Sequence, residues 1–335
     1  MRPGDAVEVR RNERAGDARP DALRPLMRRF ESDDAEQAAR LLDVLSPASV
    51  QTAESLRHRQ VSEPERARRR SWVAVDGVEL VAVATTYFRW FGGEAGKGRI
   101  WVGVREDRRR RGIGTALWDA AVAHLRGARK HTVEVDDDPA GLSFVERRAF
   151  TQYDSEVISR LDPRECELGP EAHEGSRLLR LREMGGRHRE LFEFYAAAGG
   201  IPPGDPENRV TPEEWRRFVL ANPLLDDEAS VVVVDAEDQV VSLSWLLVDH
   251  VRARAENEWT ATLPHLRGRG LARLAKLDSI SWAAEHGIIE IVTGNDPDNL
   301  PMRGLNRRLG YRELYIRRDF ERPAETRSQV PDGQG

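Results

Sequence analysis

Apolar residues recur with two different periods along this chain, and the two kinds of segment alternate through most of its length. Runs such as 80–90 and 240–248 are rich in β-branched and aromatic residues, which is typical of strands. Runs such as 33–45 and 112–125 repeat apolar residues every three or four positions, which is typical of helices. Strands that alternate with helices predict a mixed α/β (α+β) protein with a central sheet in each of its parts.

The order of these segments occurs twice, which predicts two similar domains. The strands expected in the first half are 23–30, 71–75, 80–90, 99–104, 132–135 and 151–161, and its helices are 33–45, 112–125 and 139–148. The strands expected in the second half are 177–182, 230–234, 240–248, 256–263, 288–293 and 313–320, and its helices are 187–198, 211–222, 270–284 and 300–309.

Charged and Pro/Gly-rich stretches separate and flank the two halves. We expect a disordered segment over residues 1–20, a first domain over 21–162, a linker over 163–175, a second domain over 176–322 and a mobile tail over 323–335.

The most specific motif lies between a strand and a helix in each half. The first copy is Arg109-Arg110-Arg111-Gly112-Ile113-Gly114, and the second is Arg267-Gly268-Arg269-Gly270-Leu271-Ala272. A glycine turn that begins a helix directs unpaired main-chain N–H groups and the positive end of the helix dipole at one point. Such a point binds phosphate well. Arginines are unfavourable at a helix N-terminus by themselves, so their concentration here favours a polyanionic ligand.

These motifs resemble the signature of the GNAT acyltransferase superfamily, Arg/Gln-x-x-Gly-x-Gly/Ala after the fourth strand. The second copy, over residues 262–272, fits closely, whereas the first has Arg110 where a glycine is usual. The resemblance covers residues 22–162 and 176–322 and extends to two-domain proteins similar to mycothiol synthase. It implies, in each domain, a mostly antiparallel sheet flanked by helices and splayed where an acyl-CoA lies.

The same resemblance implies acetyl-CoA as the cofactor. The residues expected to hold it in the second half are Thr262, Leu263, Pro264, Arg267, Gly268, Arg269, Gly270, Leu271, Ala272, Arg273, Asn295, Asn299 and Asn306. Those expected in the first half are Val104, Arg109, Arg110, Arg111, Gly112, Gly114 and Thr115.

Acyl transfer to an amine needs a group that takes the amine proton. Side chains alternate along a strand, so Glu256, Glu258, Thr260 and Thr262 are expected on one face. Two carboxylates on one face repel each other and can raise one pKa toward neutrality. The family often places its base on this strand, which favours Glu258 and then Glu256 as the base. The alternative is that both glutamates only face solvent.

The matched strand of the first half is expected to lack a titratable group, because its corresponding positions are Gly98, Ile100, Val102 and Val104. The first half is therefore interpreted as a degenerate copy of the second. Its expected role is either to hold CoA or to shape the acceptor pocket. Asp249 and His250 are weaker candidates for the base. Loops 88–98 and 199–209 are candidates for the acceptor pocket.

Three asparagines follow the fifth strand of the second half. Asn299 and Asn306 lie seven residues apart, hence on one helix face, and Asn295 precedes them. Their side chains can bond the amides of a pantetheine arm, which the family resemblance also implies. Asn299 is equally suited to cap its helix.

Many family members place a catalytic tyrosine four residues before a Gly-Phe or Gly-Tyr pair. Val145 and Asn306 occupy that position here, so neither half supplies this acid. Tyr311 is expected to pack, and Tyr315 is a remote candidate.

Composition narrows the function further. The net charge is −5, which argues against nucleic-acid binding through Arg108–Arg111. One cysteine, Cys166, excludes an internal disulfide and a cysteine-based metal site, and no metal is expected. No apolar run is long enough for a membrane span, and residues 1–20 lack a secretory core, so a cytoplasmic location is expected.

The sequence therefore predicts an acetyl-CoA-dependent N-acetyltransferase that acts on a small-molecule primary amine, with its chemistry in the second half. The competing hypothesis is a non-catalytic acyl-CoA sensor or interaction module. The oligomeric state is not predicted.

Overall fold

One sheet of twelve strands runs through the whole molecule. The structure, a computed structural model, describes residues 25–167 and 174–324. In chain order the strands are β1 (Leu26–Arg29), β2 (Arg70–Asp76), β3 (Glu79–Phe88), β4 (Lys97–Val104), β5 (Lys130–Val135), β6 (Thr151–Leu161), β7 (Ser176–Arg180), β8 (Val231–Asp235), β9 (Val240–Asp249), β10 (Arg254–Thr262), β11 (Glu290–Asn295) and β12 (Arg312–Pro323). Their spatial order is β1-β2-β3-β4-β5-β12-β6-β11-β10-β9-β8-β7. Neighbours are antiparallel except β4 with β5 and β10 with β11, which are parallel.

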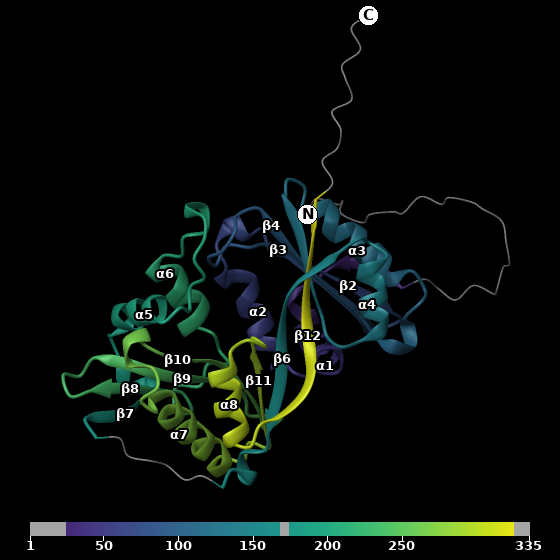
Figure 1. The fold of residues 1–335 in the computed structure, drawn as a ribbon. Coiled ribbons are helices and arrows are strands. Elements are labelled where there is room, and N and C mark those ends of the chain that lie inside the picture. Colours follow the sequence, from purple (N-terminus) through teal and green to yellow (C-terminus); the bar gives the residue numbers. More distant parts are fainter. Residues whose placement is uncertain (1–24, 168–173, 325–335) are drawn as a thin grey trace, which may run out of the picture.

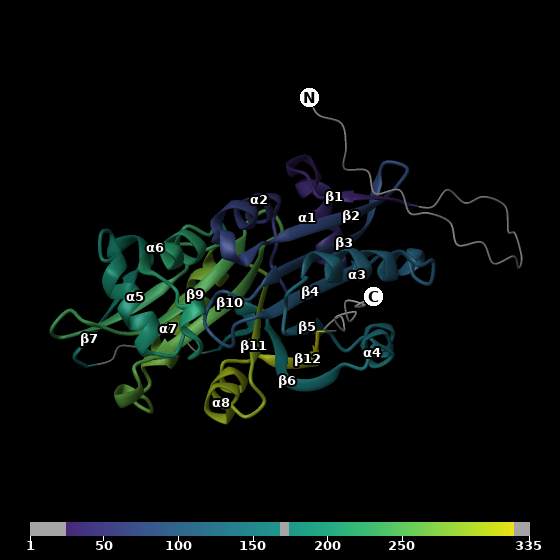
Figure 2. The same cartoon turned by 90° about the horizontal axis from the view of Figure 1, so that it is seen from above.

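Helices flank this sheet. They are α1 (Ala35–Leu45), α2 (Ala53–Ser62), α3 (Ile113–His124), α4 (Pro139–Glu146), α5 (His188–Ala197), α6 (Pro212–Trp215), α7 (Leu271–Glu285) and α8 (Leu300–Arg308). The first half of the chain and the second half lie on either side of the long strands β6 and β12 (Figure 1; Figure 2).

The two halves exchange their last strands. β12 lies between β5 and β6, with Phe320 opposite Val133 of β5 and Ile316 opposite Val157 of β6. β6 in turn pairs with β11, where its Leu161 lies opposite Ile291. The last strand of each half therefore completes the ladder of the other, and β6 and β12 lie side by side at the centre of the molecule (Figure 1).

Successive side chains of a strand point to opposite faces of the sheet, so neighbouring residues pack against different helices. Val231 and Val233 of β8 pack against α7, whereas Val232 and Val234 pack in the cluster that contains α5. In the first half, β3 is covered in the same way by α3 on one face and by α1 on the other. The valine run is thus buried on both faces, and each half is a three-layer arrangement of helix, sheet and helix.

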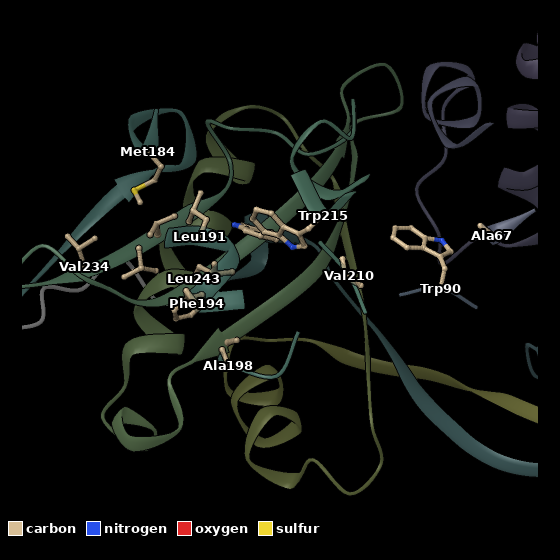
Figure 3. Packing of buried hydrophobic residues seen from close by; sticks show 14 residues of the cluster. Ala67, Trp90, Met184, Leu191, Phe194, Ala198, Val210, Trp215, Val234 and Leu243 are labelled. Atoms are coloured by element: carbon tan, nitrogen blue, oxygen red, sulfur yellow. The ribbon is translucent and has the colours of Figure 1, made fainter. Parts of the chain in front are cut away.

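An aromatic core crosses the junction between the halves. Trp90 of the first half meets Phe218 of the second edge to face, with ring centroids 5.0 Å apart. Figure 3 shows this cluster, with Ala67 and Trp90 at one end and Met184 and Val234 at the other. The amide of Asn208 donates to the carbonyl oxygens of Gly92 and Glu94, at 3.3 and 3.2 Å. The loops 88–98 and 199–209 are therefore in contact.

The expected fold class is confirmed, because a mostly antiparallel sheet flanked by helices on both faces occurs in two similar halves. Helix α2 was not expected, since few of its residues are apolar. The last turn of the helix expected over 211–222 is a π-helix at Arg216–Leu220. None of the helices in residues 25–167 and 174–324 could cross a membrane. The expected domain boundaries stay predictions, and the segments 1–20, 168–173 and 325–335 lie outside the described residues.

The strand exchange predicts that neither half is stable alone. We expect fragments 25–167 and 174–324 to aggregate or to unfold without a cooperative transition when expressed separately, because each lacks the strand that pairs with its own fifth strand. Co-expression should restore one complex with a cooperative melt, measured by size-exclusion chromatography and circular dichroism. A stable monomer from either fragment alone would contradict this expectation.

Candidate active site

Two loops of nearly the same conformation join a strand to a helix, one in each half. The first connects β4 to α3 and the second connects β10 to α7, each through a short 3₁₀ turn, Glu106–Arg108 and Pro264–Leu266. The residues before the helices, Gly112 and Gly270, have φ of 81° and 86°, and neither helix receives a side-chain cap. The first N–H groups of α3 and α7 are thus left for another acceptor, and this arrangement favours an anion such as phosphate.

The loops differ at one position but not in backbone conformation. Arg110 has a φ of 64° and Gly268 a φ of 79°. The left-handed region costs a residue with a side chain roughly 1–2 kcal/mol, so Arg110 holds the glycine-like turn under strain. The first loop therefore has the same backbone shape as the second, although Arg110 stands where the family pattern has a glycine.

The first arginine of each motif braces its own loop. Nε of Arg109 donates to the carbonyl of Val104 at 3.1 Å, and Nε of Arg267 donates to the carbonyl of Thr262 at 3.3 Å. These two contacts are equivalent in the two halves. The remaining contacts differ, because the guanidinium of Arg109 reaches Asp138 and that of Arg267 reaches the carbonyl of Ala198, each at 3.4 Å.

The parallel strand pair diverges in each half just before its loop. β4 pairs with β5 from Lys97 to Ile100, and β10 pairs with β11 only from Arg254 to Glu256. Beyond these residues the main-chain pairing of the two strands ends. The splay that the family resemblance implies is therefore present twice, with each phosphate-type loop at its end.

In the first half this splay is part of a cavity of about 570 Å³. Arg109, Arg110 and Gly114 of the loop line it, together with Val135 of β5 and Phe144 of α4. Known small-molecule pockets fall in the range of about 300–1,000 Å³. The cavity thus has the size and the anion-binding end that an acyl-CoA requires.

A β-bulge in β10 distinguishes the second half. The register of β10 against β9 shifts between Asn257 and Trp259, whereas β4 pairs with β3 without a shift. Glu258 is the extra residue. The expectation that Thr260 and Thr262 share a face with the glutamates is wrong, because an inserted residue reverses the alternation beyond it.

The hydrogen bonds of these residues confirm the reversal. Oγ1 of Thr260 donates to Oδ1 of Asn257 at 3.0 Å, and Asn257 contacts Lys276 of α7. Glu256 points the other way, where its Oε2 accepts the main-chain N–H of Val50 at 3.0 Å. The threonines therefore lie on the α7 face and Glu256 on the opposite face.

The bulge also changes which residue of the first half corresponds to Glu256. Counted from the first parallel pair of each half, Glu256 corresponds to Arg99 and not to Gly98. The expectation that no titratable group stands there is therefore wrong. Arg99 is paired with Glu134 and Asp319, each at 2.6 Å. The first half holds an arginine, paired with two carboxylates, where the second half holds a carboxylate.

Desolvation by the surrounding protein raises the pKa values of both glutamates, and the charge of Glu258 adds to the shift of Glu256. Burial, and then the charge of Glu258, raises the pKa of Glu256 to about 7, although the hydrogen bond from Val50 opposes the shift. Glu258 is exposed to solvent, yet the protein around it raises its pKa, an effect that Arg59 opposes. Burial and the charge of Glu258 raise the pKa of Tyr195 above its usual range. This places Tyr195 and Arg59 near the pair.

The first half covers this side of β10. Arg252 at the turn before β10 pairs with Asp43 of α1 at 2.6 Å, and Val50 packs with Leu247 of β9. Val50 and Arg59 were not recognised as site residues in the sequence, because they belong to the other half and to the unexpected helix α2. Tyr195 on α5 carries no motif that would have singled it out.

The three asparagines lie at the end of β11 and on α8. Asn299 caps α8, with its Oδ1 accepting the N–H of Met302 at 3.3 Å. Nδ2 of Asn306 donates to Oδ1 of Asn295 at 2.6 Å. Oδ1 of Asn306 is buried and has no hydrogen-bond partner among the residues that the structure describes. A buried acceptor without a donor is costly, and it fits the amide N–H that a pantetheine arm would supply.

The weaker candidates for the base have other partners. Oδ1 of Asp249 accepts the N–H of Val251 at 3.0 Å, and its carboxylate pairs with Arg252. His250 lies 2.7 Å from Asp226. Both residues therefore order the turn between β9 and β10.

The two tyrosines near the start of β12 lie in different surroundings. Tyr311 is 4% exposed and lies in the core beneath α7, which agrees with a packing role. Tyr315 is half-buried on β12, and burial raises its pKa to about 12. The half-buried Cys166 packs against the same core as Tyr311.

Comparison with known proteins gives a family and a fold. The model of the acetyltransferase (GNAT) family matches residues 37–150 and 189–311, more than half of the chain. The mycothiol acetyltransferase of Clavibacter sepedonicus is 23% identical over 64% of this chain and 69% of its own.

Solved structures share the two-half architecture. A tandem GNAT protein from the clavulanic acid biosynthesis pathway has a TM-score of 0.68 at 19% identity, over 90% of this chain and 99% of its own. A GCN5-related N-acetyltransferase from Sphaerobacter thermophilus has a TM-score of 0.66 at 19% identity, over 90% and 96%. At these identities the likeness concerns the fold.

The strain at Arg110 is measurable. We expect Arg110→Gly to stabilise the protein by roughly 0.5–1 kcal/mol, because glycine adopts the left-handed turn without steric cost. Gly268→Arg should destabilise it by a similar amount, since nothing lies within 4 Å of an added Cβ there and only φ is unfavourable. Chemical denaturation measures both. Arg111→Gly is the control, and an equal effect at Arg111 would refute the argument.

Proposed function

We propose that this chain, a member of the acetyltransferase (GNAT) family, transfers the acetyl group of acetyl-CoA to a small-molecule primary amine in its second half. One observation carries the proposal. The bulged strand β10 presents two carboxylates with raised pKa values beside a splayed strand pair that ends in an anion-binding loop. The first half has the loop and the splay, but its strand β4 has neither the bulge nor a carboxylate.

The residues proposed to hold acetyl-CoA follow its chemistry. Its diphosphate suits the N–H groups at the start of α7, from Gly270 to Arg273. Its amide-rich arm suits the splay, where Oδ1 of Asn306 needs a donor. When bound there, acetyl-CoA supplies the activated acetyl group. The remaining work, which is to hold the amine and to accept its proton, belongs to residues of the chain.

We assign proton acceptance to Glu258 and a supporting role to Glu256. Glu258 is exposed and adjacent to the splay, so an amine can reach it. Glu256 is held by the N–H of Val50, which leaves it less free to approach a substrate. A carboxylate with a raised pKa is a better base than an ordinary one, because its ionised form binds a proton more strongly.

The surroundings of the pair favour a compact amine. Two carboxylates attract an ammonium group as it arrives. Tyr195 and Trp259 lie next to them, with ring centroids 4.3 Å apart, and offer an apolar wall for the body of the substrate. The mycothiol acetyltransferase relative supports a small-molecule acceptor over a protein one.

Substitution of the glutamates tests the assignment. Glu258→Gln should lower kcat on the order of 10²–10⁴-fold, the usual contribution of a general base, with the KM for acetyl-CoA within about twofold of wild type. In the wild type the base must be ionised to act, so kcat/KM should fall as the pH drops through the pKa of Glu258, which lies above the usual range of a carboxylate. Thiol release from acetyl-CoA across an amine panel measures both.

Glu256→Gln is the matched control. It removes the neighbouring negative charge, so Glu258 should ionise more easily and the acidic limb should move to lower pH while kcat stays within about tenfold. Loss of rate in Glu256→Gln together with retention in Glu258→Gln would transfer the role to Glu256. If both variants kept the wild-type kcat, neither glutamate would take part in the mechanism.

The first half supports a second candidate function, a non-catalytic acyl-CoA site. Its cavity of about 570 Å³ lies at an intact loop, and Arg99, in ion pairs with Glu134 and Asp319, stands where the second half has Glu256. A site of this kind would bind the cofactor without turning it over. The sensor hypothesis thus applies to one half and the transferase hypothesis to the other.

One substitution in each loop separates the two sites. Gly114 and Ala272 occupy matched positions in the first turns of α3 and α7, and an added Cβ at Gly114 meets only Val104, at 3.5 Å. A glutamate at either position opposes a diphosphate. Titration calorimetry with CoA should show two binding events in the wild type and one in each variant. Only Ala272→Glu should abolish turnover, and an unchanged stoichiometry in Gly114→Glu would reject the second site.

A further inference from the structure

A lysine lies in the interior of the second half without an acidic partner. Lys276 of α7 is 2% exposed, and its Nζ donates to Oδ1 of Asn257. The ring of Tyr311 lies 5.0 Å away. No carboxylate pairs with Lys276 anywhere in residues 25–167 and 174–324, and burial lowers its pKa to about 7. Burying such a group is costly, so its contact with Asn257 is the feature to explain.

Asn257 is the last residue before the bulge, and its polar atoms bind both neighbouring strands. Its Nδ2 donates to Oγ of Ser244 and to the carbonyl of Trp245, both at 3.0 Å and both on β9. Its own carbonyl accepts Oγ1 of Thr293 of β11 at 3.1 Å. The register shift disrupts the ladder at this point, and these contacts replace the missing ladder bonds.

The amide of Asn257 is held at both ends. The carbonyl of Trp245 can only accept, so the NH₂ group of the amide faces it. The oxygen of the amide then faces Nζ of Lys276, which donates to it. Without a donor at position 276, the amide loses one of the two groups that hold its oxygen, the other being the hydroxyl of Thr260.

The first half provides an internal comparison. Counted across the bulge, the position of Asn257 corresponds to Ile100, and the position of Lys276 corresponds to Trp118 of α3. Ile100 and Trp118 are buried in one apolar cluster. The half with the polar pair has the bulge, and the half with the apolar pair has a regular strand.

We infer that Lys276 is a positioning residue, which orients Asn257 and thereby maintains the bulge that holds Glu258 beside the splay. The inference rests on the proposed function of Glu258. It assigns no contact between Lys276 and a substrate. The effect is expected on the rate of the step that uses Glu258, with acetyl-CoA binding at the loop left intact.

Lys276→Met tests this, because methionine has a similar length and no donor. We expect kcat to fall at least on the order of tenfold, since a small misplacement of a catalytic group is enough for such a loss. The KM for acetyl-CoA and the thermal shift with CoA should stay within about twofold of wild type. Asn257→Ala should show the same loss, and the double variant should lose no more than either single one.

Leu277→Ala is the matched control for stability. Leu277 is the next residue of α7, is fully buried and packs in the core that also contains Tyr311, so its truncation disturbs the same region without touching a polar contact. A purely structural role for Lys276 predicts that both variants melt at lower temperature and keep kcat per folded molecule. Lys276→Gln, which retains an amide donor, should recover part of the rate and also serves if the methionine variant does not fold.

Hydrogen exchange of the peptide 255–262 separates this inference from the proposed function. In Lys276→Met this peptide should exchange at least tenfold faster than in Leu277→Ala, whether or not any amine is turned over. If exchange is faster in Lys276→Met but the protein acetylates no amine, the positioning role of Lys276 would stand and the proposed transferase function would be rejected. Unchanged exchange, or a kcat loss equal to that of Leu277→Ala, would overturn the inference.

Discussion

The main-chain ladder that β12 forms with β5 and β6 is the interaction on which the rest of the structure depends. The splay of the second half opens between β10 and β11, and β11 is bonded on its other side to β6 of the first half. The position of β11 is thus fixed by a strand that the other half supplies. The width of the proposed acyl-CoA site is therefore a property of both halves, even if only one half carries out chemistry.

The two halves show how one backbone plan supports different chemistry. Their loops share a left-handed turn, an arginine brace and a helix start, although Arg110 replaces a glycine. They diverge a few residues earlier, at the splay. There the first half has Arg99 in a closed ion cluster, and the second half has Glu256 under the N–H of Val50. A single inserted residue, Glu258, accompanies this change.

The loops and most elements could be predicted from the sequence, because a glycine turn between a strand and a helix has a local signature. The bulge could not, since one extra residue leaves no periodic trace and reverses the faces of Thr260 and Thr262. The strand exchange could not either, because β6 and β12 have the same pattern of residues whichever sheet they join. Helix α2 was missed because it has few apolar residues. It carries Arg59, so part of the candidate site was missed with it.

The role of Lys276 could not be predicted from the sequence for a different reason. A lysine between Ala275 and Leu277 on an apolar stretch of helix is a detectable signal, but its meaning depends on Asn257 on a distant strand. The contact between them is set by tertiary packing. From the sequence around each residue alone, Lys276 would be described as a surface cation and Asn257 as an amide on a strand.

Joining the halves into one sheet also reduces the number of open strand edges. Two separate sheets would leave four edges unpaired, whereas among the described strands the continuous sheet has two edges, β1 and β7. These strands are short, with four and five residues, and both carry arginines. Short, charged edges are poor templates for pairing with another chain. The exchange of strands therefore protects the protein against edge-to-edge aggregation, independently of any role in catalysis.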